Sequence, residues 1–329
     1  MIINGLGIGA LAAVLLTGAI PTNARESDAS PESVGGESAE DTAEPFELGI
    51  DRDRYERMTV PVTIAGKGPY RFFIDTGAQA TVVTHGVTRD LDLAPTGRAT
   101  LVAMGSSKVV ETIDIDGLEF ADRRVSGLTA PLLERSNIGA DGILGLDSLQ
   151  DLRVLMDFRE DRITVADARV LGGNDGYEIV VRARRKLGQM IITDARLDGI
   201  RTAVIIDTGT HLSLGNLALL RKLRAKGSET LTATDVHGVA IESRLEVAKR
   251  LEIGQMTLTG VPIGFADSPA LAALGLQDRP ALILGMGNLR MFERVAIDFA
   301  SRRILFDLPG TGRDAARTAR DLMGYPPPN

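Results

Sequence analysis

Two aspartates in this chain stand in the same short sequence setting, so the chain carries two carboxylates with matched surroundings. The segment FIDTGA at 73–78 recurs 132 positions later as IIDTGT at 205–210. In both copies an apolar strand ends in Asp-Thr-Gly, and the glycine lets the backbone turn sharply after the strand. A single Asp-Thr-Gly is also an ordinary strand-ending turn. The recurrence is what points to chemistry by Asp75 and Asp207.

Two carboxylates held close together have a specific chemistry. They do not both ionise easily, so they share one proton and titrate as a pair. The ionised member takes a proton from a water held between them. The protonated member donates to a substrate carbonyl, and the water adds to give a tetrahedral diol. This chemistry needs no metal, thiol or histidine, which suits a chain of 329 residues with no cysteine and three histidines.

Further landmarks recur in the same order, which indicates an internal repeat. DGILGL at 141–146 returns as ALILGM at 281–286, and MDF at 156–158 returns as IDF at 297–299. The spacing drifts from 132 to 140 and 141 positions, as differences in loop length would produce. Two copies favour a pseudo-symmetric pair of lobes. A two-fold between the lobes would bring Asp75 and Asp207 together.

The elements that position these motifs are expected to be mostly strands. From about Phe46 the sequence runs in short Val, Ile, Leu and Thr stretches broken by Gly, Asp and Pro, which predicts an all-β body. Three short helices are expected, at His85–Leu91, Asp147–Leu152 and Asn216–Arg224, and the last has leucines near one face at helical spacing. The stretch 295–308 is expected to return as a strand to a sheet between the lobes.

With these motifs in hand, the chain resembles an aspartic peptidase. Each Asp-Thr-Gly is followed by a hydrophobic-hydrophobic-Gly element. Each half is similar to a retropepsin-like domain, and the layout of two lobes in one chain resembles pepsin. Exported bacterial proteins of the two-domain retropepsin-like kind resemble it most, over roughly residues 47–308. The resemblance implies an all-β, bilobal acid-protease fold with two β-barrel-like lobes and a cleft between them. The hydrophobic-hydrophobic-Gly elements are Ile143, Leu144 and Gly145, and Ile283, Leu284 and Gly285.

The resemblance also implies roles for single residues. Asp75 and Asp207 would be the catalytic dyad. The threonines that follow them would hydrogen-bond across the two-fold, and the glycines after those would present backbone N–H groups to the carboxylates. Gly145 and Gly285 would let an apolar strand pass close behind each loop, a plain turn glycine being the alternative. The loop-supporting residues are Thr76, Gly77, Thr208, Gly209 and Thr210.

Members of this family close the cleft with β-hairpin flaps, two in retroviral enzymes and one in pepsin. The candidates here are Leu101–Val109 and Leu231–Ile241, neither of which contains the tyrosine of the pepsin flap. One flap, two flaps and plain surface hairpins all stay open. The candidate flap residues are Met104, Gly105, Ser106, His237 and Gly238.

The two catalytic loops are chemically unequal at the position after the glycine. Position 78 is Ala, as in retroviral enzymes, and position 210 is Thr, nearer to pepsin. We hypothesise that the Thr210 hydroxyl bonds Asp207 and favours its ionised form. Asp75 would then hold the shared proton more often.

Charge and hydropathy divide the chain into segments. Residues 1–24 carry no charge and read as a signal peptide or N-terminal anchor, although no Lys or Arg precedes the apolar run. Residues 25–47 hold eight acids and one arginine, and the rest holds 36 of each sign. We expect 25–46 to be a disordered acidic linker. Two peptidase lobes at 47–168 and 176–310 and a tail at 311–329 would follow. The protein would be periplasmic or secreted, with membrane anchoring by the N-terminal segment as the alternative to its cleavage.

Several function classes are disfavoured. The net charge of -7 and an aromatic content of 4% argue against nucleic-acid binding. There is no Gly-x-Ser-x-Gly elbow, His-Glu-x-x-His or Walker loop. The sequence therefore predicts an aspartic endopeptidase, a hydrolase that works as a monomer on an extended polypeptide without metal or cofactor. The alternative is a catalytically silent two-lobed protein that binds peptides or resembles an inhibitor.

Overall fold

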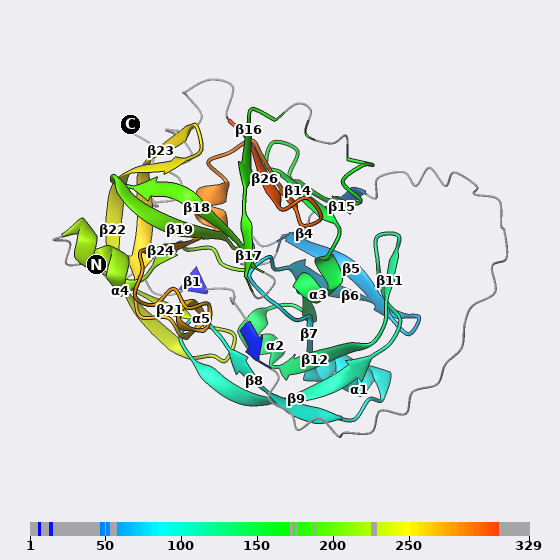
Figure 1. The fold of residues 1–329 in the computed structure, drawn as a ribbon. Coiled ribbons are helices and arrows are strands. Elements are labelled where there is room, and N and C mark those ends of the chain that lie inside the picture. The colour runs from blue at the N-terminus through cyan, green and yellow to red at the C-terminus, as the bar shows by residue number, and fades with distance from the viewer. Residues whose placement is uncertain are drawn as a thin grey trace, which may run out of the picture.

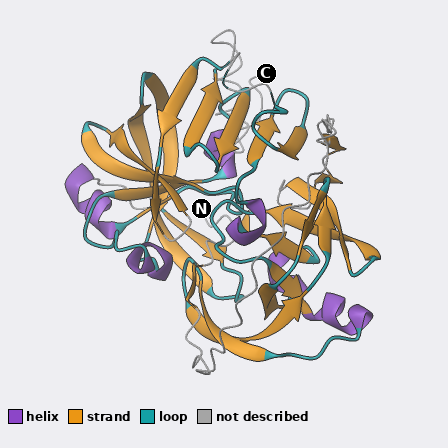
Figure 2. Cartoon of the chain, turned by 45° about the vertical axis from the view of Figure 1, so that its right-hand side comes forward, coloured by secondary structure: helices purple, strands orange, loops and turns teal. Residues whose placement is uncertain are grey.

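The computed structural model describes residues 58–171, 174, 177–186, 189–224 and 229–308, together with short strands at 6–7, 13–15, 47–49 and 51–52. Strands make up most of this part of the chain, and the helices are short (Figures 1 and 2). The expected all-β, two-lobed fold is confirmed.

The first lobe is built on one large sheet with three short helices. A central strand of this sheet, β13, pairs in parallel with β6 and antiparallel with β7. It therefore threads between the two strands that flank the Asp75 loop. The elements are β5 (Met58–Ile64), β6 (Lys67–Ile74), β7 (Val82–Thr84), α1 (His85–Leu91), β8 (Gly97–Val102), β9 (Ser107–Ile115), β10 (Leu118–Phe120), β11 (Arg123–Val125), β12 (Leu128–Leu133), α2 (Arg135–Ile138), β13 (Gly142–Leu144) and α3 (Leu146–Leu149).

The second lobe repeats this plan. Its strand β24 pairs in parallel with β19 and antiparallel with β20, as β13 does with β6 and β7. The internal repeat seen in the sequence is thus a repeat of topology. The elements are β17 (Arg184–Lys186), β18 (Gln189–Leu197), β19 (Ile200–Ile206), β20 (Leu214–Gly215), α4 (Leu217–Leu223), β21 (Thr230–Thr234), β22 (Ala240–Ile253), β23 (Met256–Phe265), α5 (Pro269–Ala273), β24 (Ala281–Leu284) and α6 (Met286–Leu289).

A third sheet joins the lobes. Its strands run in the order β16-β26-β25-β14-β15-β3, and the antiparallel pair β14–β25 links the end of the first lobe to the end of the second. The stretch 295–308 does return to this sheet, as the two strands β25 and β26. The bounds are β3 (Glu47–Gly49), β14 (Arg153–Asp157), β15 (Arg162–Ala166), β16 (Ile179–Arg182), β25 (Arg294–Asp298) and β26 (Arg303–Asp307).

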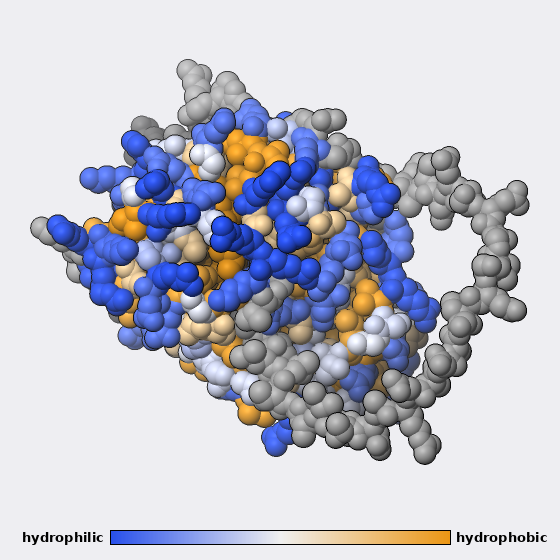
Figure 3. Space-filling view, viewed as in Figure 1, coloured by the Kyte–Doolittle hydropathy of each residue, from blue (hydrophilic) through white to orange (hydrophobic). Residues whose placement is uncertain are grey.

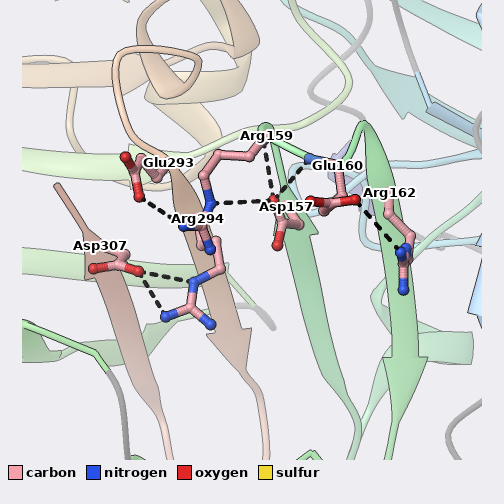
Figure 4. Close-up of polar contacts among 7 residues, drawn as sticks. All are labelled: Asp157, Arg159, Glu160, Arg162, Glu293, Arg294 and Asp307. Carbon is pink, nitrogen blue, oxygen red and sulfur yellow. Dashed lines mark hydrogen bonds and ion pairs between the residues drawn. The ribbon is translucent and has the colours of Figure 1, made fainter. Parts of the chain in front are cut away.

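Charged side chains fasten this third sheet, both within the second half and across the lobe boundary (Figure 4). Arg294 donates from Nε to Oδ2 of Asp307 on the neighbouring strand at 2.8 Å. Arg159, in the turn between β14 and β15, pairs with Glu293 of the second half at 3.2 Å. Deeper in the sheet, Arg153 and Asp298 form an ion pair at 2.7 Å with both side chains 2% exposed. The two lobes are therefore bound into one body.

Two of the three expected helices are found with small shifts, and the third is shorter. The helix at His85–Leu91 has the expected bounds, and Asn216 caps the next one by accepting from the Leu219 N–H. The prediction of a helix at Asp147–Leu152 was wrong at its end, because α3 stops at Leu149. Gln150 has extended backbone angles, and Asp151 has a φ of 66°. These conformations end the helix.

The N-terminal residues that the structure describes form strands. β1 (Leu6–Gly7) pairs with β21, and β2 (Ala13–Leu15) pairs with β8. A further short strand, β4 (Asp51–Arg52), pairs with β5. The rest of 1–24, the segment 25–46 and the tail 311–329 fall outside the described residues, so the leader, linker and tail stay predictions, as do the lobe bounds. No described helix is both long and apolar enough to cross a membrane.

The surface is mostly polar on the face seen in Figure 3. An apolar area stands out near the place where Figure 1 labels β16, the strand that carries the partly exposed Val180. The largest apolar core extends through both lobes. Two smaller clusters lie beside the two Asp-Thr-Gly loops, and each combines residues of one lobe with a residue from the hairpin of the other.

Candidate active site

The two Asp-Thr-Gly loops meet at the centre of the molecule and hold each other through their threonines. The Thr76 hydroxyl donates to the Ile206 carbonyl at 2.9 Å, and the Thr208 hydroxyl donates to the Ile74 carbonyl at 2.7 Å. Each hydroxyl also accepts the backbone N–H of the opposite threonine, at 3.0 and 3.2 Å. These four bonds obey the two-fold that relates the lobes.

This arrangement buries both aspartates completely. Gly77 N–H donates to Oδ1 of Asp75 at 2.7 Å, and Gly209 N–H donates to Oδ1 of Asp207 at 2.8 Å. The Ala78 N–H adds a second bond to Asp75, at 3.0 Å. One oxygen of each carboxylate is thus fixed by its own loop.

The other oxygen of each carboxyl is available to its partner. Oδ2 of Asp75 and Oδ2 of Asp207 are buried and receive no bond from a donor group in the described part of the chain. The two carboxyls are near enough to hydrogen-bond each other. Two ionised carboxylates have no proton for such a bond, so the pair needs one shared proton. Sequence reasoning anticipated this geometry.

Burial raises the pKa of both aspartates. Desolvation, followed by the charge and hydrogen bond of Asp207, raises the pKa of Asp75 well above its usual range. Desolvation also raises the pKa of Asp207 to about 6, against the opposing effect of hydrogen bonds from Asp75, Gly209 and Thr210. Both shifts favour retention of a proton within the pair.

The hypothesis that the Thr210 hydroxyl hydrogen-bonds Asp207 was wrong. That hydroxyl donates to the Leu212 carbonyl at 3.1 Å. Thr210 acts on the Asp207 carboxylate through its backbone N–H, in addition to the Gly209 N–H, as the Ala78 N–H acts on Asp75 in addition to the Gly77 N–H. The side chain at this position therefore does not account for the difference between the two aspartates.

The hydrophobic-hydrophobic-Gly elements pass directly behind the loops. The Leu144 carbonyl accepts from the Asp75 N–H at 3.0 Å, and the Leu284 carbonyl accepts from the Asp207 N–H at 3.1 Å. Ile143 and Ile283 are fully buried in the two smaller clusters. The glycines that follow are needed for space. A Cβ on Gly145 would lie 2.4 Å from the Ala80 carbonyl carbon, and one on Gly285 would lie 2.9 Å from three carbonyl oxygens.

A polar cluster behind the first loop was not foreseen. Asp147 accepts the N–H of Thr81 at 2.9 Å and its hydroxyl at 2.7 Å, and Ser148 lies 2.6 Å from the same hydroxyl. The Thr81 hydroxyl also accepts from the Gly145 N–H. In the second lobe the Gly285 N–H donates to the hydroxyl of Ser213 instead. The sequence signal was the Asp-Ser directly after the first motif, which the second motif replaces by Gly-Asn.

The two candidate flaps are hairpins whose tips meet. β8 and β9 form the first, and β21 and β22 the second. Ser106 donates to Asp235 at 2.5 Å and lies 2.7 Å from Nδ1 of His237. A Cβ on Gly105 would lie 2.3 Å from the Ile241 side chain, and one on Gly238 would lie 3.0 Å from Asn137.

Ser106, Asp235 and His237 do not form a nucleophilic triad. Asp235 accepts a hydrogen bond from the serine hydroxyl. Its bond with His237 is to the backbone N–H rather than to the imidazole ring. Since Ser106 donates to Asp235, His237 must donate its Nδ1 proton to Ser106. Its other nitrogen, Nε2, is buried without a partner among the described residues, and burial lowers the pKa of His237. This cluster joins the tips, which suits a closing element.

Apolar contacts cross the same boundary in both directions. Met104, from the first hairpin, is fully buried among second-lobe residues that include Ile205 and Ile283. Val236, from the second hairpin, packs with first-lobe residues that include Phe73 and Ile143. Each hairpin therefore completes the cluster of the opposite lobe, above the dyad loops.

Comparisons with known families agree with this geometry. The family model described as gag-polyprotein putative aspartyl protease matches residues 60–151, and the family model described as aspartyl protease matches residues 193–287. No curated protein matches the chain. The two matches fall in tandem, one on each lobe, and each contains one Asp-Thr-Gly loop and the hydrophobic-hydrophobic-Gly element behind it. This chain belongs to the two-domain retropepsin-like aspartic peptidases.

We predict that Gly209→Ala removes activity. A Cβ at this position would lie 2.2 Å from Oδ2 of Asp75, so the carboxyl of the opposite loop must move. A displacement of about 1 Å in a reacting group costs about 100-fold in rate, and kcat/KM should fall at least that far. Gly86→Ala is the matched control, because its Cβ meets only ordinary contact at 3.6 Å. Equal activity of the two variants would contradict the prediction.

We predict maximal activity near neutral pH. The base must be ionised, and Asp207 ionises as the pH rises through about 6. The acid must be protonated, and the raised pKa of Asp75 keeps its proton above that pH. Activity should therefore fall on the acid side as Asp207 gains a proton and on the alkaline side as Asp75 loses one. Measuring kcat/KM from about pH 4 to about pH 9 tests this, with circular dichroism to exclude unfolding. A maximum near pH 3 or 4 would disprove it.

Proposed function

We propose that this protein is an aspartic endopeptidase in which Asp75 and Asp207 activate water against a peptide bond. The observation that carries the proposal is the buried pair of carboxyls, each fixed through Oδ1 and each with an Oδ2 that receives no other bond among the described residues. Perturbed pKa values in such a pair are typical of acid–base catalysis.

Over the two steps of the proposed reaction, the pair of aspartates receives two protons and gives up two protons. Ionised Asp207 takes a proton from water, whose oxygen bonds to the peptide carbon, while Asp75 gives its proton to the carbonyl oxygen. The product is a neutral diol. Asp207 then gives its proton to the amide nitrogen as the C–N bond breaks, and Asp75 takes a proton from a diol hydroxyl. The pair ends with its starting protonation, so no other proton donor is required.

The proposed substrate is an extended polypeptide in the cleft between the lobes, with both hairpins acting as flaps. The contacts between Ser106, Asp235 and His237 hold the tips closed over the dyad. Substrate entry would require these contacts to open. One chain supplies both aspartates, which supports a monomeric enzyme. Among described residues no cluster of three or more His, Asp or Glu is placed to hold a metal.

A silent binding protein is the second candidate, and the site does not favour it. Loss of activity on this fold requires only the loss of one carboxyl or a distorted loop. Here both aspartates, both threonines and both glycines keep their hydrogen bonds.

We also propose that the protein is exported. The uncharged apolar segment at 1–24 supports this, with small residues before the acidic stretch. The mass of the N-terminal peptide in the exported fraction distinguishes a cleaved leader from an anchor, and recovery of the full chain only inside the cell would refute export.

We predict that Asp207→Asn abolishes peptide cleavage while preserving the fold. The purified wild type and variant would be incubated with a diverse peptide mixture, and the products mapped by mass spectrometry. The wild type should cut and the variant should not. Asp194→Asn is the matched control, since Asp194 is exposed in the same lobe, and it should cut normally.

Measuring the free energy of unfolding shows whether the variant has lost catalysis alone or has also lost its fold. The raised pKa of Asp207 means that the folded protein binds this proton more tightly than the unfolded chain does. Its contribution to stability is therefore lost as the pH rises through about 6. Asparagine has no carboxyl to ionise, so the variant does not lose stability in this way. Its free energy of unfolding at neutral pH should equal or exceed that of the wild type. Cleavage by the variant, or by neither protein at any pH, would count against the proposed function.

A further inference from the structure

Gln189 is a buried polar residue beside the catalytic loop that the proposed mechanism does not use. It is the first residue of β18 in the second lobe and is 1% exposed. Its side-chain Nε2 donates to the Gly77 carbonyl of the first lobe. Gly77 is the residue whose N–H holds Asp75. A side chain of one lobe thus reaches the loop that carries the aspartate of the other.

Only half of the Gln189 carboxamide is satisfied. Oε1 is buried and receives no hydrogen bond from the described residues. The amide cannot be turned over to correct this, because Oε1 would then face the Gly77 carbonyl, acceptor against acceptor. The contact with Gly77 therefore fixes Oε1 as an acceptor that lacks a donor. Most buried acceptors in native proteins receive a hydrogen bond from a donor group.

The direction of the side chain identifies where that partner lies. Alternate residues of a strand point to the same face, so Gln189 and Ile191 share one face of β18. Ile191 packs in the cluster that contains Met104 of the first hairpin and Ile241 of the second. Gln189 therefore faces the region between the catalytic loop and the hairpins, where an extended substrate would run.

We propose that Gln189 binds the main chain of the substrate, with Oε1 accepting one backbone N–H of the extended peptide on the Gly77 side of the dyad. The Nε2 bond to Gly77 holds the acceptor in place. An extended peptide presents an N–H at regular intervals whatever its side chains are, so the contact sets the register of the scissile bond relative to Asp75. Gln189 is thus a positioning residue, and this role rests on the proposed function.

A main-chain contact has a consequence for specificity. Proline has no N–H, so one substrate position should reject proline whatever the neighbouring side chains are. Replacing that amide by an ester, which has an oxygen in place of N–H, should have the same effect without changing the side chain.

The test is an ester scan of a peptide that the protein cuts, carried out on the full chain. Each backbone N–H near the cleavage point is replaced in turn, and kcat and KM are measured with wild type, Gln189→Met and Gln277→Met. Gln277 is an exposed glutamine of the same lobe. In the wild type and in Gln277→Met, one replacement should lower kcat/KM about tenfold, equivalent to about 1.4 kcal/mol. In Gln189→Met that replacement should have no effect, while the other replacements keep their wild-type cost.

The outcomes separate the two proposals. If the wild type cuts and the ester profile is the same in all three proteins, the role of Gln189 is wrong and the proposed function stands. If the wild type cuts no peptide, the proposed function fails and the role of Gln189 falls with it. Gln189→Asn, whose carboxamide is one methylene shorter, serves if the Met variant does not fold, and it should lose the same ester effect. Sensitivity that follows substrate side chains, rather than one backbone position, would also overturn the proposal.

Discussion

The reciprocal bonds between Thr76 and Thr208 are the constraint on which the rest of the site depends. Each threonine uses its hydroxyl as a donor to the opposite strand and as an acceptor for the opposite N–H. Neither loop can satisfy these buried groups within its own lobe. Buried polar groups without partners are costly, so the folded state requires the loops to meet. The aspartates, one residue earlier in each loop, are brought together as a consequence.

That geometry works against stability at the centre of the molecule. Removing the two carboxyls from solvent disfavours their ionised forms, and this raises the pKa of each. The surrounding structure must therefore hold the lobes together elsewhere. The third sheet does so through the β14–β25 pairing and the buried pair of Arg153 and Asp298. Burial would raise the pKa of Asp298, but the Arg153 hydrogen bond and charge lower it below its usual range. The molecule thus combines one stabilised buried charge, at Asp298, with a buried pair of carboxyls whose ionisation is disfavoured.

Much of the fold could be predicted because its information is local or repeated. The repeated Asp-Thr-Gly and hydrophobic-hydrophobic-Gly motifs identified both loops, and apolar spacing supported the helix at Asn216. The end of α3 was not predictable, because it depends on the backbone of Gln150 and Asp151 rather than on propensity. Gln189 carries no motif at all. Its importance comes from a contact with Gly77 that is 112 residues away in sequence, and only the folded structure brings these residues together.

The two halves are related by symmetry but are not equivalent. Asp147 supports the first loop, and Gly287 occupies the matching position behind the second. Gln189 of the second lobe contacts the first loop. A homodimer must place identical groups on both sides, whereas a single chain can change one side alone. A peptide has a direction, and a cleft with unequal sides can distinguish its two orientations. The same inequality gives Asp75 and Asp207 different surroundings, which the proposed mechanism uses to assign one carboxyl as the acid and the other as the base. Duplication within one chain therefore provides both the matched pair of aspartates and the freedom to make them different.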